Sequence, residues 1–170
     1  MLYYNQGKGN KTKQGENKME RKVIAFDMDG TIADLYAVEG WLKMLRAEDA
    51  RPYMMAQPMW DMEELANVLN ELKMVGWEVR IITWLSKDSS QCYKDQVRQA
   101  KREWLEEIGF PFDYFHGVRY GATKADSIRK IAYYAILIDD NDKVREGWHL
   151  GATINAVEEN IIEVLKSMLI

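Results

Sequence analysis

The chain has 170 residues, of which 47% are hydrophobic and 29% are charged, and its net charge at neutral pH is -4. These values are typical of one globular domain with its own core, and they exclude a low-complexity or wholly disordered chain. Cys92 is the only cysteine, so no internal disulfide can form and a reducing compartment is expected. The sequence has no apolar run long enough for a membrane span and no apolar stretch typical of a secretory signal. We therefore expect a cytoplasmic protein without membrane contact.

Charge is distributed unevenly along the chain. Residues 1–22 carry +4, and because the whole chain carries -4, the remaining 148 residues carry -8. The first residues are mostly Lys, Asn, Gln and Gly, so we predict a flexible basic tail over 1–20 and one domain over 21–170. Such a tail suits contact with a polyanion, or it is an upstream extension before an alternative start at Met19. The acidic remainder disfavours nonspecific binding to nucleic acid.

Short apolar runs alternate with segments of helical spacing. The first elements predicted are a strand over 23–26, a helix over 35–46 and a helix over 60–75 that ends at Gly76. Further strands are predicted over 79–83, 113–118, 135–138 and 151–155, and further helices over 93–108, 124–132, 144–149 and 157–169. Strands that alternate with helices indicate βαβ units. We therefore expect an α/β, Rossmann-like parallel sheet of about five strands with helices on both faces.

Polar side chains follow several of these strands, at the edge where a parallel sheet binds ligands. They are carboxylates after the first and fourth strands, a threonine at the end of the second, and a lysine that opens the helix after the third. The residues are Asp27, Asp29, Thr83, Lys124, Asp139 and Asp140. Crowded carboxylates repel one another, and oxygen ligands suit Mg²⁺, whereas the lysine and the hydroxyl suit a phosphate. Gly30 would let backbone amides approach such an anion closely.

The segments Phe26–Thr31 (FDMDGT), Thr83, Lys124 and Leu137–Asp140 (LIDD) resemble, in order, the four motifs of the haloacid dehalogenase (HAD) superfamily. The resemblance covers roughly residues 22–155 and implies a HAD-like catalytic domain. It implies that Asp27 is a nucleophile that forms an aspartyl-phosphate, and that Asp29 is first a general acid and then a base. Because family members that release phosphate usually have this second acid and dehalogenases lack it, a phosphatase or phosphotransferase is favoured over an enzyme that cleaves carbon–halogen bonds.

The same resemblance implies the rest of the site. Thr83 would hydrogen-bond a phosphoryl oxygen, and Lys124 would neutralise charge on the nucleophile and the phosphoryl group. The implied ligands of Mg²⁺ are Asp27, Asp29 through its carbonyl, Asp140 and, as neighbour or substitute, Asp139. Beyond these residues, the candidate substrate contacts are Gly30, Thr31, Trp84 and Arg119. Trp84 suits stacking on a base or core packing, and Arg119 suits substrate binding or a surface ion pair.

Residues 34–59 form a minimal cap-like insertion, too short for a full cap domain. The site should therefore be fairly open, as suits a bulky substrate such as a polymer end, or it is closed by a homo-oligomer. The DMDG-x-x-AD pattern of 27–34 resembles 5'(3')-deoxyribonucleotidases, which carry a larger cap. Other features resemble the phosphatase domain of phage polynucleotide kinase-phosphatase. They are the small insertion, the helix with Tyr93, Val97, Lys101, Trp104 and Leu105, and Ile138–Asp140 followed by Val144 and Trp148.

Taken together, these patterns predict a magnesium-dependent phosphomonoesterase. Its expected substrate is a nucleotide or the phosphate end of a polynucleotide. One alternative is a phosphatase for small metabolites such as sugar phosphates. Another is a protein that keeps the HAD fold and binds a phosphorylated ligand without turnover.

Overall fold

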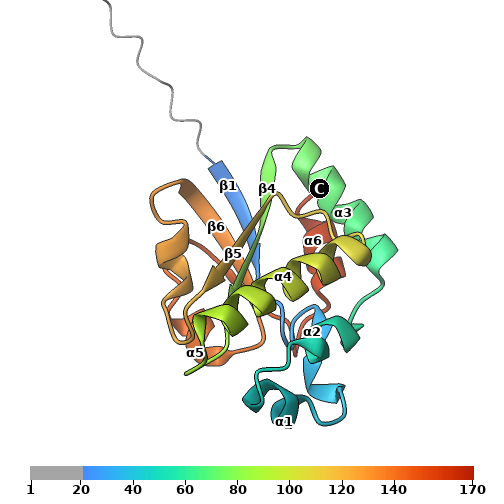
Figure 1. Cartoon of the computed structure of the whole chain (residues 1–170). Helices are drawn as coiled ribbons and strands as arrows, with labels where there is room; N and C mark the ends of the chain where they lie inside the picture. The colour runs from blue at the N-terminus through green and yellow to red at the C-terminus, as the bar shows by residue number, and fades with distance from the viewer. Residues whose placement is uncertain (1–20) are drawn as a thin grey trace, which may run out of the picture.

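Five parallel strands form the centre of the structure, a computed structural model that describes residues 21–170 (Figure 1). Their order in the sheet is β5-β4-β1-β6-β7. The strands are β1 (Arg21–Phe26), β4 (Trp77–Trp84), β5 (Tyr114–Val118), β6 (Ala132–Asp139) and β7 (Thr153–Asn155). The predicted α/β, Rossmann-like sheet is thereby confirmed. The tail predicted over 1–20 lies outside the described residues.

The sheet separates two apolar layers, because successive side chains of a strand point to opposite faces. The larger core lies on the face of the sheet to which Ile24 and Phe26 point. A smaller core lies on the opposite face, to which Val23 and Ala25 point. The first face is covered by α3 (Met62–Met74), part of α4 (Gln91–Glu107) and α6 (Ile161–Ser167). The second is covered by η2 (Lys124–Ser127) and the region of α5 (Asp142–Glu146). Among the helices described, none is both long and apolar enough to cross a bilayer.

The insertion between β1 and α3 folds into short elements below the carboxyl ends of the strands, as Figure 1 shows. They are β2 (Ala33–Asp34), η1 (Leu35–Ala37), α1 (Trp41–Arg46), α2 (Arg51–Met55) and β3 (Gln57–Pro58), which pairs antiparallel with β2. The helix predicted over 35–46 is wrong as one element. Val38 is extended and Gly40 has a φ of 71°, so the chain turns between η1 and α1 instead of continuing the helix.

The helix predicted over 124–132 is also wrong, because only the four residues of η2 are helical. Ala125 and Ile128 are buried in the smaller core, and their i, i+3 spacing matches one turn of a 3₁₀-helix. The chain then turns back and enters β6 at Ala132. Lys124 is therefore anchored at the sheet edge by a buried turn.

Side-chain contacts dock the insertion on the N-terminal part of α4. The Glu48 carboxylate accepts hydrogen bonds from the backbone N–H (2.7 Å) and hydroxyl (2.6 Å) of Ser90, which caps α4. The Tyr93 hydroxyl donates to the carbonyl of Asp49 (3.2 Å). Tyr53 is buried beside Tyr93 in a small apolar cluster. These contacts place the insertion as one wall over the carboxyl ends of the strands.

Candidate active site

Three adjacent strands deliver the polar residues to one edge of the sheet. β1 lies between β4 and β6, and Phe26 is in register with Ile81 and Ile138. The next residue, Asp27, continues the pairing because its N–H donates to the carbonyl of Ile138 (2.9 Å). Asp139 ends β6 and so lies beside Asp27. The parallel register therefore creates the convergence that the sequence predicts.

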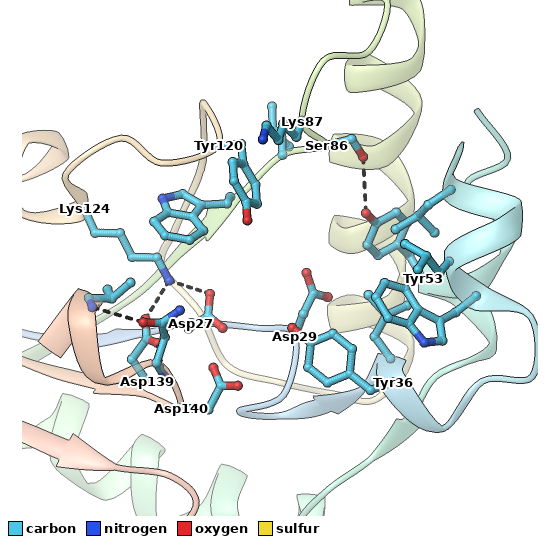
Figure 2. Close-up of a pocket in the computed structure, with 18 of the residues that line it drawn as sticks. Asp27, Asp29, Tyr36, Tyr53, Ser86, Lys87, Tyr120, Lys124, Asp139 and Asp140 are labelled. Atoms are coloured by element: carbon cyan, nitrogen blue, oxygen red, sulfur yellow. Dashed lines mark hydrogen bonds and ion pairs between the residues drawn. The ribbon is translucent and has the colours of Figure 1, made fainter. Parts of the chain in front are cut away.

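Asp27, Asp139 and Asp140 form a cluster of three carboxylates (Figure 2). Each offers one oxygen, and these oxygens lie within 4.8 Å of one another. Lys124 reaches the cluster from η2, and its Nζ donates to Asp27 Oδ1 (2.5 Å) and Asp139 Oδ2 (2.7 Å). Asp27 is 8% exposed, so its carboxylate remains accessible from the pocket that it lines.

The charges in this cluster are unbalanced. Burial, followed by the charge of Asp27, raises the pKa of Asp139 and of Asp140 to about 6. Burial lowers the pKa of Lys124, but Asp27 and Asp139 outweigh this effect, so its pKa lies above the usual value. A single ammonium group thus faces three carboxylates. Because a bound divalent cation would relieve their repulsion and prefers oxygen ligands, these residues fit a metal site.

The two neighbouring aspartates differ in how many of their oxygens are already occupied. Asp139 accepts hydrogen bonds on both oxygens, from Lys124 and from the N–H of Asn141 (2.9 Å). Within residues 21–170, Asp140 has no lysine or arginine partner. Gly30 lies directly against it, at a φ of +79°, and a Cβ at this position would overlap Asp140 Oδ2. Asp140 therefore has more free lone pairs for a cation than Asp139.

Thr31 is placed beneath the carboxylates. It is fully buried, and its hydroxyl accepts a hydrogen bond from the N–H of Asp140 (3.1 Å). The same hydroxyl donates to Asp27 Oδ2 at 3.5 Å. Thr31, predicted as a substrate contact, is thus bonded to the Asp27 carboxylate and to the backbone of Asp140.

Asp29 and Thr83 form a second polar group, organised by Lys101. The ammonium group of Lys101 donates to Asp29 Oδ2 (2.6 Å), to Thr83 Oγ1 (2.7 Å) and to the carbonyl of Trp84 (3.0 Å). Burial raises the pKa of Asp29, although the charge of Lys101 acts in the opposite direction. Asp29 Oδ1 is buried and has no hydrogen-bond partner in the described part of the chain.

Lys101 belongs to none of the four motifs and was not predicted as a site residue. A signal was nevertheless present. Lys101 lies between Val97 and Trp104 on the stripe of α4 that is otherwise apolar and buried. A lysine at a core position of an amphipathic helix needs a polar partner, because burial of an unpaired charge is costly.

A pocket of about 600 Å³ is lined by Asp27, Asp29, Lys124, Asp139 and Asp140 (Figure 2). Thr83, predicted as a catalytic residue, is fully buried and does not line this pocket. Tyr36, Trp41 and Tyr53 line it from the insertion, and Trp84 and Tyr120 line it from the opposite side. The two sides also contribute one cation each, Arg46 and Lys87.

Trp84 is half-buried and held in place on this wall. Its indole N–H donates to the carbonyl of Ala122 (2.9 Å), and its ring lies 5.0 Å from that of Tyr120. Arg119, the other predicted substrate contact in this region, is exposed and is not among the residues that line the pocket. Its neighbour Tyr120 occupies the wall instead.

No protein-family model and no curated protein matches the sequence. Among solved structures, the fold is similar to a chain of the Pnkp1/Rnl/Hen1 complex, with a TM-score of 0.57 and 15% identity; the match covers 92% of this chain and 56% of that one. It is also similar to a chain of the Pnkp1/Rnl/Hen1 RNA repair complex, with a TM-score of 0.56 and 15% identity, over 80% of this chain and 43% of the other. The protein thus spans about half the length of these chains and shares their α/β fold.

Proposed function

We propose that this protein is a metal-dependent phosphomonoesterase that acts through an aspartyl-phosphate on Asp27. The observation that carries the proposal is the position of Asp27 at the end of the central strand. There it lies 2.5 Å from Lys124 Nζ and shares a possible metal site with Asp139 and Asp140. The motif resemblance to HAD phosphatases supports the same assignment.

The proposed reaction has two displacements at phosphorus. An oxygen of Asp27 attacks the phosphorus, a new O–P bond forms, and the ester P–O bond breaks while Asp29 gives its proton to the leaving oxygen. Asp29, now ionised, then takes a proton from a water molecule whose oxygen attacks the same phosphorus. The Asp27 O–P bond breaks, and inorganic phosphate and the free carboxylate result. The raised pKa of Asp29 favours the protonated form that the first step needs.

Lys124, Thr83 and the metal ligands supply the electrostatic part. Lys124 offsets negative charge on Asp27 and on the phosphoryl oxygens, and the Thr83 hydroxyl donates to one of these oxygens. Asp27 and Asp140, with Asp139 beside them, would hold the cation, together with the Asp29 carbonyl that the resemblance implies. When bound, Mg²⁺ neutralises charge on the transferred phosphoryl group and on the carboxylates.

We further propose that the substrate is a nucleotide or a nucleic-acid phosphate end. The pocket has the size of a small-molecule site, and aromatic rings line two of its sides. Trp84 with Tyr120, and Tyr36 with Trp41, offer faces on which a base can stack. Arg46 and Lys87 line the pocket and would offset the charge of further phosphates of such a substrate. The fold shared with chains of an RNA repair complex is consistent with this substrate class.

The test is a phosphate-release screen across 3'- and 5'-mononucleotides, 3'-phosphorylated oligonucleotides, sugar phosphates and 4-nitrophenyl phosphate, with Mg²⁺ and with EDTA. Turnover that needs Mg²⁺ and disappears in Asp27→Asn is expected, with nucleotides or oligonucleotides as the best substrates. The matched control is Asp126→Asn, which removes an exposed carboxylate paired with Arg129. Turnover of sugar phosphates alone would refute the substrate class, and wild-type activity in Asp27→Asn would refute the mechanism.

A further inference from the structure

Lys101 approaches the site from the α4 side of the sheet, whereas Lys124 approaches from the other face. The Lys101 side chain is 0% exposed. Its three hydrogen bonds, to Asp29 Oδ2, Thr83 Oγ1 and the Trp84 carbonyl, have lengths of 2.6, 2.7 and 3.0 Å. Because an ammonium group has three protons, these acceptors occupy it fully. Lys101 therefore has no proton left to donate to a substrate.

We infer that Lys101 is a positioning residue that holds Asp29 and Thr83 in the orientations needed for proton transfer and phosphate binding. This inference rests on the proposed phosphatase function and adds to it a residue that acts without touching the substrate. Two consequences of its hydrogen bonds, one for each acceptor side chain, support it.

The first consequence concerns Asp29. Lys101 holds Oδ2, so the carboxyl group cannot rotate freely, and Oδ1 is left without a hydrogen-bond partner among residues 21–170. A buried oxygen without a partner is unfavourable in the resting protein, but it remains available to a reacting group. Asp29 lines the pocket beside Asp27, as Figure 2 shows. The leaving oxygen of a substrate bound there would meet a carboxyl group of fixed orientation.

The second consequence concerns Thr83. A hydroxyl has one proton, and because Lys101 donates to Oγ1, the hydroxyl acts as acceptor in this contact. Its own proton is then not used in this contact, and Thr83 is fully buried next to the pocket-lining Trp84. We infer that this proton meets a phosphoryl oxygen when substrate enters the site. With an acceptor in place of Lys101, the same proton would be consumed inside the protein. Lys101 thus sets the hydrogen-bond direction of Thr83 as well as its rotamer.

Packing alone does not explain a lysine at this position. Lys101 belongs to the buried stripe of α4, where a methionine would fill a similar volume without the desolvation of a charge. The ring of Tyr53 covers the ammonium group at 5.0 Å, so the insertion seals it from water. The three acceptors of this buried ammonium group belong to Asp29, Thr83 and the backbone of β4. A role in orienting these acceptors therefore explains the lysine better than packing does.

The test is a double-mutant cycle between Lys101→Met and Asp29→Asn, with kcat and KM for the best substrate of the screen at saturating Mg²⁺. Lys101→Met should lower kcat about 100-fold, the size expected when a reacting group is displaced by about 1 Å, and should change KM by less than about threefold. In the Asp29→Asn background, the same change should lower kcat by less than about fivefold, because its main target is already disabled. A kcat within about threefold of wild type, or an equal loss in both backgrounds, would overturn the inference.

A matched control separates orientation from loss of a buried cation. Arg80 is 3% exposed and paired with Glu78 on the same strand as Thr83, but it does not line the pocket. Arg80→Met should lower the melting temperature and leave kcat within about twofold. If Lys101→Met does not fold because Asp29 is left unpaired, the neutral Lys101→Met/Asp29→Asn protein takes its place. A kcat close to that of Asp29→Asn supports the inference, and a further loss of about 100-fold overturns it.

A structural measurement keeps this inference separate from the proposed function. If the wild-type protein hydrolyses none of the substrates, the proposed function fails. The positioning role can still be tested by comparing crystal structures of the wild type and of Lys101→Met. If only the Lys101→Met/Asp29→Asn protein folds, the rotamer of Thr83 is compared instead. Rotation of the Asp29 or Thr83 side chain in the variant supports positioning. Side chains that keep their wild-type rotamers without Lys101 refute it, whatever the turnover.

Discussion

The substitution Asp140→Asn tests whether repulsion among the carboxylates of Asp27, Asp139 and Asp140 favours binding of a cation. The substitution is nearly isosteric and removes one of three crowded carboxylates. In the protein without metal, burial and then the charges of Asp27 and Asp139 raise the pKa of Asp140 from 3.8 to about 6. The ionised carboxylate is therefore destabilising in the folded protein at neutral pH, and an amide should relieve this. We expect the variant to be more stable than the wild type in EDTA.

The magnitude follows from the pKa. A difference of roughly two pH units corresponds to about 3 kcal/mol, and because Asp140 is half-buried and partly screened by solvent, we expect about 1–2 kcal/mol. For a domain of this size, this raises the melting temperature by roughly 3–6 °C. The sign with pH follows from proton binding. A raised pKa means that the folded wild type binds more protons than the unfolded chain between about pH 4 and 6, so its stability falls as the pH rises through this range.

The assay is thermal and urea unfolding of both proteins in EDTA at about pH 4.5 and about pH 7.5, followed by titration with Mg²⁺ at the higher pH. The advantage of Asp140→Asn should be greatest at the higher pH and mostly absent at the lower one. Mg²⁺ should then stabilise the wild type by mass action and the variant much less. A variant less stable than the wild type in EDTA at the higher pH would refute the electrostatic reasoning, as would an advantage independent of pH. Equal stabilisation of both proteins by Mg²⁺ would refute Asp140 as a ligand.

Three further substitutions test other parts of the site. Asp27→Asn should lower kcat at least about 100-fold, since an amide is a poor nucleophile, while circular dichroism and the melting temperature show an intact fold; unfolding of this variant would contradict a chemical role. Gly30→Ala should cost about 1–3 kcal/mol in urea unfolding, because its φ is +79° and a Cβ would overlap Asp140 Oδ2 and crowd the ring of Tyr36. An unchanged urea midpoint would mean that the Gly30 loop is not held as described. Trp84→Ala should raise the KM of a nucleotide about tenfold, in line with the loss of one stacking contact, and leave the KM of a sugar phosphate nearly unchanged. Equal changes for both substrates would argue against base stacking.

The sheet and several residues at its edge could be predicted from the order of apolar runs and polar residues. The apolar run Val23–Phe26 is buried on both faces, as a central parallel strand must be, and Asp27 follows it directly. Because parallel strands all end at one edge, strand prediction was sufficient to place Asp27 near Asp139 and Thr83. The positions of these residues could be predicted because each lies at or directly after the end of a strand.

The contacts that distinguish neighbouring residues depend on the packed fold. The motif resemblance favours Asp140 over its neighbour Asp139 as a metal ligand, but their contacts are visible only in the structure: Asp139 is bonded to Lys124, and Asp140 is without a cationic partner in the described chain. Likewise Tyr120, and not Arg119, lies in the pocket wall. In both cases the outcome depends on which way a side chain leaves the backbone at the end of a strand or in a loop, and apolar spacing contains no information about this.

The contacts of Lys101 also could not be predicted from local sequence, because they join residues far apart in the chain. Its contact with Asp29 joins residues 72 positions apart and requires that α4 pack on one face of the sheet at a particular depth. The apolar spacing of α4 is consistent with a buried position 101, because periodicity reports which face of a helix turns inward. It did not predict the partner, since the acceptors of a buried ammonium group come from segments that only the packed fold brings together. A helix in this region was therefore predictable from the sequence, whereas the contacts of its buried side depend on how α4 packs on the sheet.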